Sequence, residues 1–229
     1  MKASKYPLKR GAVRVRPNGI RPRGVGPNGI RPRGERRSPL LPASIRAGMG
    51  NDLHRLVPGR KLILGGVHIP FPKGPAGHSD GDALAHAICD ALLGAAALGD
   101  IGRHFPDTSP KWHAASSLLF LRRVRKLLQD AGYAIVNVDA TVGLERPRLS
   151  PHIPRMQEKL ARALGLESGQ VSVKAKTGEG LDAVGRGEAV RADAVAVIVE
   201  SRESRVESRE VESRPFSREV EGQESKVEG

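Results

Sequence analysis

The stretch His78-Ser79-Asp80-Gly81-Asp82-Ala83-Leu84-Ala85-His86 decides how this chain is organised, because it joins a polar loop to an Ala/Leu-rich helix. In that helix Asp82, His86 and Asp90 are spaced i, i+4, i+8 and fall on one polar line. The opposite side carries an apolar stripe at helical period, formed by Leu84, Ile88, Ala91, Leu92 and Ala95. The pattern predicts a helix that packs with one face and presents His86 with the other.

Taken alone, His86 could equally be a structural histidine, partly buried and hydrogen-bonded. Asp82 would then be an acid near the positive end of the helix. The segment Asp52-Leu53-His54 favours a functional role for His86 over a structural one. On a strand, residues i and i+2 point to the same face, so Asp52 and His54 lie side by side. With His86 they supply three N/O ligands, and a catalytic zinc site has three protein ligands and one open position. We predict a divalent metal site at Asp52, His54 and His86.

These residues suggest metal-assisted chemistry on a phosphorylated small molecule. The open position of the metal would take a phosphate oxygen, so that the ion acts as Lewis acid and template. Phosphoryl transfer requires reacting groups held in line and negative charge neutralised, more than covalent help from the protein. We therefore expect a site of metals, hydroxyls and cations rather than a Ser-His-Asp triad.

Further segments in a fixed order carry a family resemblance from about Gly48 to about Glu200. They are Gly65-Gly66-Val67-His68-Ile69-Pro70, Leu92 to Gly102, Phe105-Pro106-Asp107-Thr108, Pro151-His152-Ile153-Pro154 with Met156, and Gly185-Arg186-Gly187-Glu188. With the two segments above, they resemble the 2-C-methyl-D-erythritol 2,4-cyclodiphosphate synthase family.

The resemblance implies a metal-dependent phosphorus-oxygen lyase of non-mevalonate isoprenoid biosynthesis. In this reaction the 2-phosphate of 4-diphosphocytidyl-2-C-methyl-D-erythritol 2-phosphate attacks the substrate's own β-phosphorus, and CMP leaves. The resemblance also implies a homotrimer with active sites between neighbouring subunits. Zinc is expected at Asp52, His54 and His86, and magnesium or manganese is expected to bridge the diphosphate near Glu179.

Matching positions imply roles for individual residues. His78 and Thr177 match catalytic groups: a transition-state-stabilising histidine and a hydroxyl that steadies the diphosphate. Residues expected to contact substrate are Asp52, His54, Ser79, Asp100, Ile101, Gly102, Phe105, Pro106, Asp107, Thr108, Ser109, Pro147, Arg148, Lys176, Glu179, Ala183 and Arg186. Of these, Pro147 and Arg148 match the cytidine pocket of the adjacent subunit, although Arg148 is nearly as well read as a surface arginine.

Three positions depart from the family pattern: Asn51 and Ala183 stand where aromatic residues are usual, and Lys176 replaces the first residue of a Thr-Thr pair. Asp80 and Asp82 are expected to brace the loop and cap the helix rather than bind metal. Asp90 is expected to orient a ligand histidine from outside the metal shell. His68, His104, His113 and His152 have no chemical partner in the sequence and are read as structural or solvent-facing.

The charge of the chain is unevenly distributed. Of the formal net charge of +13 over 229 residues, +12 lies in residues 1–47. Pro-Asn-Gly-Ile-Arg-Pro-Arg-Gly occurs at 17–24 and again at 27–34, and Ser-Arg-Glu-Val-Glu occurs at 208–212 and 217–221. We therefore divide the chain into a basic low-complexity tail (1–44), a synthase-like domain (45–200) and a charged repetitive tail (201–229), with both tails disordered.

The central part predicts one α/β (α+β) domain. We expect strands at 61–69, 133–144, 170–176 and 189–200, and helices at 82–98, 113–131 and 151–164, with Gly99 ending the first helix. They would form a mixed four- to five-stranded sheet packed against about three helices. The last strand is continuously apolar, which is typical of a strand covered on both faces or lying at a subunit contact.

Two other functions stay open at this point: a zinc-dependent phosphohydrolase that uses the same three ligands, and an RNA-associated protein acting through residues 1–47. Specific nucleic-acid binding is not expected, since that tail has almost no aromatic residues to stack on bases. An overextended reading frame is another possible origin of the tails. One cysteine (Cys89), no secretory h-region and no apolar run of about 18 residues predict a cytoplasmic enzyme without a membrane span.

Overall fold

The computed structural model describes residues 44–201, and all of them belong to the compact unit that begins at Leu41. The predicted tails, residues 1–44 and 201–229, therefore fall outside the described residues except for Ser44 and Ser201. None of the described helices has the length and apolar character that a membrane span requires.

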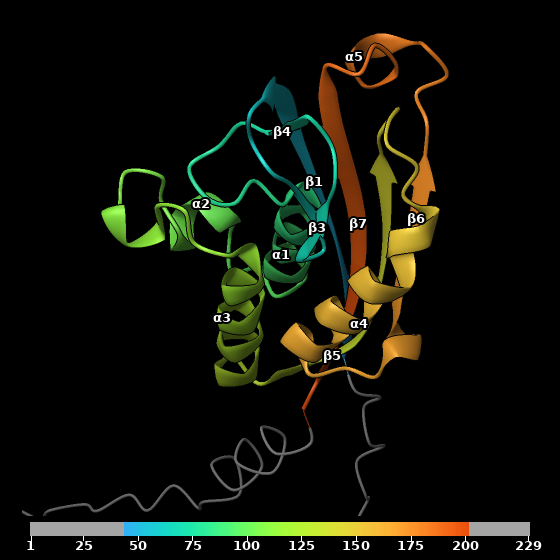
Figure 1. The fold of residues 1–229 in the computed structure, drawn as a ribbon. Helices are drawn as coiled ribbons and strands as arrows, with labels where there is room; N and C mark the ends of the chain where they lie inside the picture. Colours follow the sequence, from blue (N-terminus) through green and yellow to red (C-terminus); the bar gives the residue numbers. More distant parts are fainter. Residues whose placement is uncertain (1–43, 202–229) are drawn as a thin grey trace, which may run out of the picture. The chain divides into compact units, whose positions relative to one another are not determined.

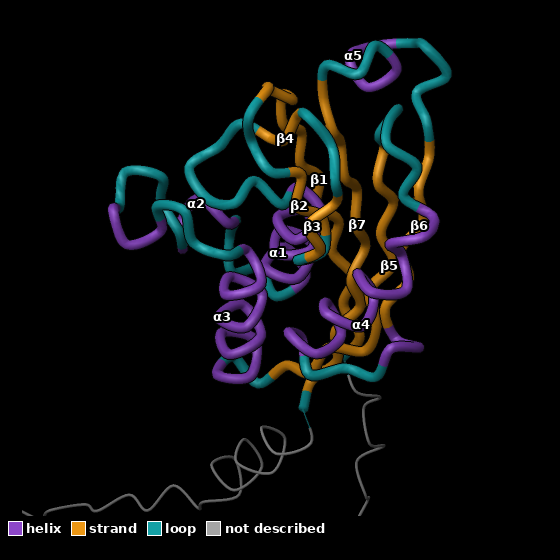
Figure 2. The backbone as a smooth tube through the Cα atoms, in the orientation of Figure 1, coloured by secondary structure: helices purple, strands orange, loops and turns teal. Residues whose placement is uncertain are grey.

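Five strands form one mixed sheet, drawn as arrows in Figure 1 and in orange in Figure 2. In spatial order they are β4 (Lys73–Pro75), β1 (Ile45–Pro58), β7 (Ala189–Glu200), β5 (Tyr133–Gly143) and β6 (Val171–Lys176). Neighbours pair antiparallel, except that β5 and β6 are parallel. In the register of β1 with β7, Ile45 lies opposite Val199 and Arg55 opposite Ala189. The expected mixed sheet in an α+β domain is confirmed.

Three long helices cover one face of this sheet (Figure 1): α1 (Ala83–Ala95), α3 (Ser117–Asp130) and α4 (Ile153–Leu164). Two one-turn helices, α2 (Ile101–His104) and α5 (Asp182–Gly185), lie in the connections. The predicted start of α3 at His113 is wrong, because Pro110–Trp112 form a separate 3-10 turn and Ala114 has a φ of +54°. The helix begins where the chain returns to helical geometry, at Ser117.

The end of α1 also differs from the prediction that Gly99 terminates it. The helix ends at Ala95, and the residue in the left-handed conformation is Ala97, with a φ of +57°. Ala97 N donates to Gly94 O (3.0 Å) and Leu98 N donates to Leu93 O (2.9 Å). These are the two hydrogen bonds of a Schellman cap, so an alanine takes the place that glycine usually occupies.

Helix α1 packs closely on β1 at two glycines. A Cβ added at Gly48 would lie 2.1 Å from Ala91 O, and one added at Gly50 would lie 2.2 Å from Ala87 O. The backbone of the helix thus occupies the space that side chains would fill on this strand. Since alternate strand residues share a face, the same face of β1 continues to Asp52 and His54.

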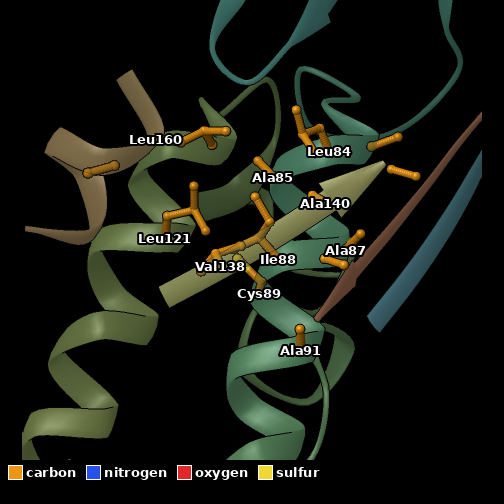
Figure 3. Close-up of a cluster of buried hydrophobic side chains, with 14 of the residues drawn as sticks. Leu84, Ala85, Ala87, Ile88, Cys89, Ala91, Leu121, Val138, Ala140 and Leu160 are labelled. Carbon is orange, nitrogen blue, oxygen red and sulfur yellow. The ribbon is translucent and has the colours of Figure 1, made fainter. Parts of the chain in front are cut away.

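The core surrounds α1 on two sides rather than one. Leu84, Ile88 and Leu92 are fully buried, as expected, but Ala85 and Cys89 are fully buried as well. Figure 3 shows Ile88 and Cys89 of α1 in one buried cluster with Val138 of β5 and Leu121 of α3. The helix lies between the sheet and α3, so the sequence stripe marked only part of its buried surface. Cys89 is a free, buried thiol in this cluster.

The predicted strand at 61–69 is a hairpin of two strands, β2 (Leu62–Leu64) and β3 (Val67–Ile69). Gly65 and Gly66 form its turn, with φ of +55° and +70°. Positive φ at both central residues is the geometry of the tight turns that match strand twist, and glycine adopts it without strain. The Gly-Gly pair therefore reverses the chain.

The opposite face of the sheet carries apolar side chains that no described residue covers. Met49 is 73% exposed, Leu53 is 62% exposed and Val195 is 45% exposed. Met49 and Val195 are direct partners in the pairing of β1 with β7. The apolar run of β7 is therefore buried on the helix side only, and its other side is open in the single chain.

Candidate metal centre

Two side chains of β1 and one from the first turn of α1 lie close together. Asp52 Oδ2 lies 2.9 Å from His54 Nε2 and 2.9 Å from His86 Nδ1, and the two histidine nitrogens are 3.3 Å apart. The alternation of β1 places Asp52 and His54 on the helix face. The close approach at Gly48 and Gly50 then brings the first turn of α1 within reach. The structure thus brings together all three predicted metal ligands.

The donor set fits a zinc ion. Bonds of about 2.0–2.1 Å in a tetrahedral shell separate ligand atoms by about 3.3–3.4 Å, and the histidine nitrogens already have that spacing. One carboxylate and two imidazoles leave a fourth position open. All three side chains line a cavity of about 540 Å³, from which a further ligand could approach a bound ion.

The charges of the three groups are interdependent. Burial raises the pKa of Asp52, but the hydrogen bonds and charges of His54 and His86 lower it by more, so its pKa falls well below the usual range. The hydrogen bond to Asp52 raises the pKa of His54 above 6.5, against the opposing effect of burial. The site is therefore built around an ionised carboxylate, the form that binds a cation.

The predicted roles of Asp80 and Asp82 agree with their contacts. Asp82 is fully buried at the N-cap of α1, where it accepts hydrogen bonds from Ala85 N (3.1 Å), Gly65 N (2.9 Å) and Gly66 N (2.6 Å). Burial and the charge of Asp80 raise the pKa of Asp82 to about 6, although the three N–H donors oppose the shift. Asp82 therefore joins the hairpin turn to the helix that presents His86.

The loop that carries His78 and Ser79 is held by Arg60, which sequence reasoning missed. Arg60 Nε donates to Pro75 O (3.1 Å), and its Nη2 donates to Gly77 O (3.0 Å) and Ser79 O (3.1 Å). Ser79 and His78 both line the cavity. A guanidinium with donors in a fixed fork suits three carbonyls in a row, so Arg60 fixes this loop beside the metal centre.

The other nitrogen of His86 faces two hydroxyls. His86 Nε2 lies 2.9 Å from Ser117 Oγ and 3.2 Å from Ser79 Oγ. Ser117 is a second residue that sequence reasoning missed. It lies 31 positions beyond His86, and only the packing of α3 on α1 brings it close.

The contacts of Ser79 with His86 and of His86 with Asp52 also follow the order of a Ser-His-Asp triad. Gly77 and Gly81 even flank Ser79 at the spacing of a nucleophile elbow. Two observations favour the metal centre. The same Asp52 oxygen contacts His54 as closely as it contacts His86, and His86 Nε2 is nearer to Ser117 than to Ser79.

Aromatic side chains form one wall of the cavity. Phe105 stacks on Phe120 with ring centroids 4.6 Å apart, and Trp112 meets Phe105 edge-on at 5.2 Å. Phe120 also stacks on the His86 ring at 6.2 Å. Trp112 and Phe120 are lining residues that the sequence reading did not name. The wall therefore places apolar aromatic surface next to the metal ligands.

Further predicted site residues line the same cavity, namely Ile101, Gly102, Phe105, Pro106 and Asp107. Asp100, Thr108 and Ser109 are not among the lining residues, and Asp100 instead caps α2 by accepting from Arg103 N (2.9 Å). Asp90 lines the cavity but accepts its hydrogen bond from Ile101 N (2.7 Å). It thus fixes the start of α2, and the described contacts show no hydrogen bond from it to a ligand histidine.

A second group of predicted site residues does not reach this cavity within one chain. At the end of β6, on the loops after β5 and β6 and around α5, they are Pro147, Arg148, Lys176, Thr177, Glu179, Ala183 and Arg186. Figure 1 places α5 away from the long helices. Within this group Thr177 Oγ donates to the Glu179 carboxylate, and Arg186 pairs with Glu188 (3.2 Å).

The fold and the three-ligand cluster define an α+β protein with a metal centre between a strand and a helix. Residues 45–199 match the YgbB family, and the chain belongs to that family. The chain is 59% identical over 154 residues to the 2-C-methyl-D-erythritol 2,4-cyclodiphosphate synthase of Salinibacter ruber, covering 67% of this chain and 98% of the relative. It is 56% identical over 163 residues to the synthase of that name from Desulfosudis oleivorans, covering 70% and 97%.

A solved structure carries the same name. The structure of a 2C-methyl-D-erythritol-2,4-cyclodiphosphate synthase in a CDP-bound form matches with a TM-score of 0.62 at 42% identity, covering 67% of this chain and 99% of that one. The family resemblance seen in the sequence is therefore confirmed.

Proposed function

We propose that this chain converts 4-diphosphocytidyl-2-C-methyl-D-erythritol 2-phosphate to 2-C-methyl-D-erythritol 2,4-cyclodiphosphate and CMP. The observation that carries the proposal is the convergence of Asp52, His54 and His86 on one cavity in a chain of the YgbB family. The reaction is a step of non-mevalonate isoprenoid precursor synthesis, and we assign the enzyme to the cytoplasm.

The chemistry requires little covalent participation by the protein. An oxygen of the 2-phosphate forms a bond to the β-phosphorus, and the bond from that phosphorus to the CMP oxygen breaks, so no further reactant is consumed. Asp52, His54 and His86 would hold a zinc ion that acts as Lewis acid on a phosphate oxygen. His78 and Ser79 line the cavity beside it, where they would position and stabilise the reacting phosphates.

The second group of site residues lies outside the described cavity, and we assign it to the other end of the substrate. Thr177 would donate a hydrogen bond to the diphosphate, and Glu179 would bind a magnesium or manganese ion that bridges it. Lys176 would neutralise phosphate charge, while Pro147, Arg148 and Ala183 would contact the cytidine end. Arg186 would lie near the axis of an assembly.

We assign the assembly as a homotrimer with each active site between two subunits. The separation of the two groups of site residues within one chain supports this arrangement, since a neighbouring subunit can bring its second group to the first. The uncovered face with Met49, Leu53 and Val195 also supports it. Burying such a face is favourable by about 25 cal/mol for each Å² of apolar surface removed from water.

The test is to incubate the purified protein with the cytidine-diphosphate substrate, zinc and magnesium, and to follow the products by phosphorus NMR. Equal amounts of CMP and a cyclic diphosphate are expected. Free phosphate or a linear product without the cyclic species would instead identify a zinc-dependent phosphohydrolase. Turnover that persists after zinc is removed with a chelator would point to the Ser79–His86–Asp52 arrangement and overturn the metal-dependent proposal.

A further inference from the structure

We propose that Ser117 and Asp80 are positioning residues that fix the tautomer and orientation of His86. The two residues form a chain of contacts behind the imidazole: Asp80 holds Ser117, and Ser117 Oγ lies 2.9 Å from His86 Nε2. The inference rests on the proposed role of His86 as a metal ligand through Nδ1. It assigns to the start of α3 a function in metal binding.

The direction of each hydrogen bond follows from the number of protons available. Ser117 has one hydroxyl proton, and Ser117 Oγ donates it to Asp80 Oδ1, while Ser117 N donates to Asp80 Oδ2 (3.0 Å). The carboxylate can only accept, so the hydroxyl has no proton left for His86. Ser117 Oγ therefore accepts from His86, which requires the imidazole proton to be on Nε2. Nδ1, which faces Asp52 and His54, is then the nitrogen that would offer its lone pair to a metal ion.

Ser117 is separated from the substrate. Its exposed fraction is 0%, and it is not among the residues that line the cavity, whereas Ser79 on the same imidazole nitrogen does line it. Ser79 Oγ accepts from Gly81 N (3.2 Å), so its own proton can point into the cavity. The two hydroxyls thus have different roles. Ser79 faces the substrate, and Ser117 acts only through His86.

The backbone holds these partners in register. Ala114 N donates to His78 O (2.9 Å), and Asp80 N donates to Ala115 O (3.1 Å). Two backbone hydrogen bonds therefore join the loop with His78 to the segment before α3, next to the Asp80–Ser117 contact. A stable connection of this kind gives the hydroxyl one position relative to the His86 ring.

The experiment measures zinc affinity by competition with a chromophoric chelator on the full-length protein, with cobalt absorption as a second probe of the ligand set. Ser117→Ala is expected to weaken zinc binding by about 10–100-fold, the usual effect of removing a partner of a metal-bound histidine. Ser117→Thr keeps the hydroxyl and is expected to recover most of the affinity. Asp80→Asn places an amide N–H₂ against a Ser117 donor, so it should weaken binding in the same direction. Ser116→Ala is the matched control, because Ser116 precedes the helix without a side-chain capping bond.

Parental zinc affinity and an unchanged cobalt spectrum in Ser117→Ala would overturn the inference. So would an equal loss in Ser116→Ala, because the effect would then belong to the start of α3 in general. Thermal unfolding of the metal-free variants checks that they fold. These measurements do not use turnover, so a failure of the cyclisation assay and a failure of this inference are distinguishable.

Discussion

Gly50 lies against Ala87, with the backbone of α1 in the place where a side chain of β1 would be. A Cβ at Gly50 would be 2.2 Å from Ala87 O and 2.5 Å from Ala91 N. Because Ala87 follows His86 directly, this contact sets the distance between the strand that carries two metal ligands and the helix that carries the third.

Gly50→Ala should therefore affect both stability and metal binding. The methyl group meets backbone atoms that cannot rotate away, and overpacking of this kind costs about 1–3 kcal/mol of unfolding free energy. If the helix shifts to relieve the contact, the Asp52–His86 spacing opens and zinc affinity falls. Urea unfolding and chelator competition measure the two effects.

Gly94→Ala is the matched control on the same helix. At Gly94 the nearest atom to an added Cβ is Met49 O at 4.0 Å. Replacing a helical glycine by alanine in open space should stabilise the protein by about 0.5–1 kcal/mol. Gly50→Ala with unfolding free energy and zinc affinity equal to the parent would contradict the proposed role of this contact.

Arg60→Ala should slow turnover while leaving the metal site intact. Arg60 holds three carbonyls of the loop with His78 and Ser79, and hydrogen bonds from charged donors are worth about 1.5–3 kcal/mol each when protected from water. Since Arg60 is exposed, we expect a smaller effect, of about tenfold in kcat/KM. Arg60→Lys should not restore activity, because an ammonium group lacks the planar fork.

The neighbouring Lys61→Ala serves as the control for loss of a cation at this turn. Steady-state kinetics and stoichiometric zinc content test both variants. A full loss of zinc in Arg60→Ala, or parental kinetics, would show that the loop does not depend on this residue in the way described.

In the metal-free protein, the contribution of His54 to stability should depend on pH. The pKa of His54 is raised above 6.5 in the folded state, so its stabilising effect is complete below pH 6.5 and is lost as the pH rises through the folded value. The pKa of Asp52 is lowered from 3.8, so its effect is present above pH 3.8 and is lost only in strong acid. Both contributions are therefore present between about pH 4 and 6.5.

Urea unfolding of the parent and of His54→Gln, both with chelator, isolates this contribution. The difference in unfolding free energy should be largest between about pH 4 and 6.5 and should shrink toward pH 8. With zinc the trend should reverse, since the metal competes with protons for the imidazole. If the difference in unfolding free energy instead increases with pH in the metal-free protein, the proposed contribution of His54 is contradicted.

Thr177→Val tests the second group of site residues. Valine keeps the β-branched shape, so folding and assembly should change little. If the hydroxyl stabilises the diphosphate as charge shifts, its loss should lower kcat by about 10²–10³ with a much smaller change in substrate affinity. Thr141→Val, the same change on β5, is the control. A kcat within about twofold of the parent would remove Thr177 from the catalytic groups.

Local sequence patterns predicted most of the helices and strands. The residues that they did not mark take their roles from contacts between distant segments. The spacing of Asp52, His54 and His86 was sufficient to predict the metal centre, because strand and helix periods fix which side chains share a face. Ser117 and Arg60 act through contacts between segments that are separate in sequence, so no local spacing marks them. The end of α1 was misplaced because glycine usually takes the left-handed cap position, whereas here Ala97 adopts it.

The pairing of β1 with β7 has a consequence for the order in which the site forms during synthesis. All three metal ligands lie within residues 52–86, but β1 has β7 as its neighbour, with Asp52 opposite Ala192. Since β7 follows all three long helices in chain order, it is synthesised well after the three ligands. A nascent chain that stops before Ala189 contains every ligand and lacks the strand that holds two of them in place. The strand order therefore leaves the two ligands of β1 without their neighbouring strand until β7 has been made.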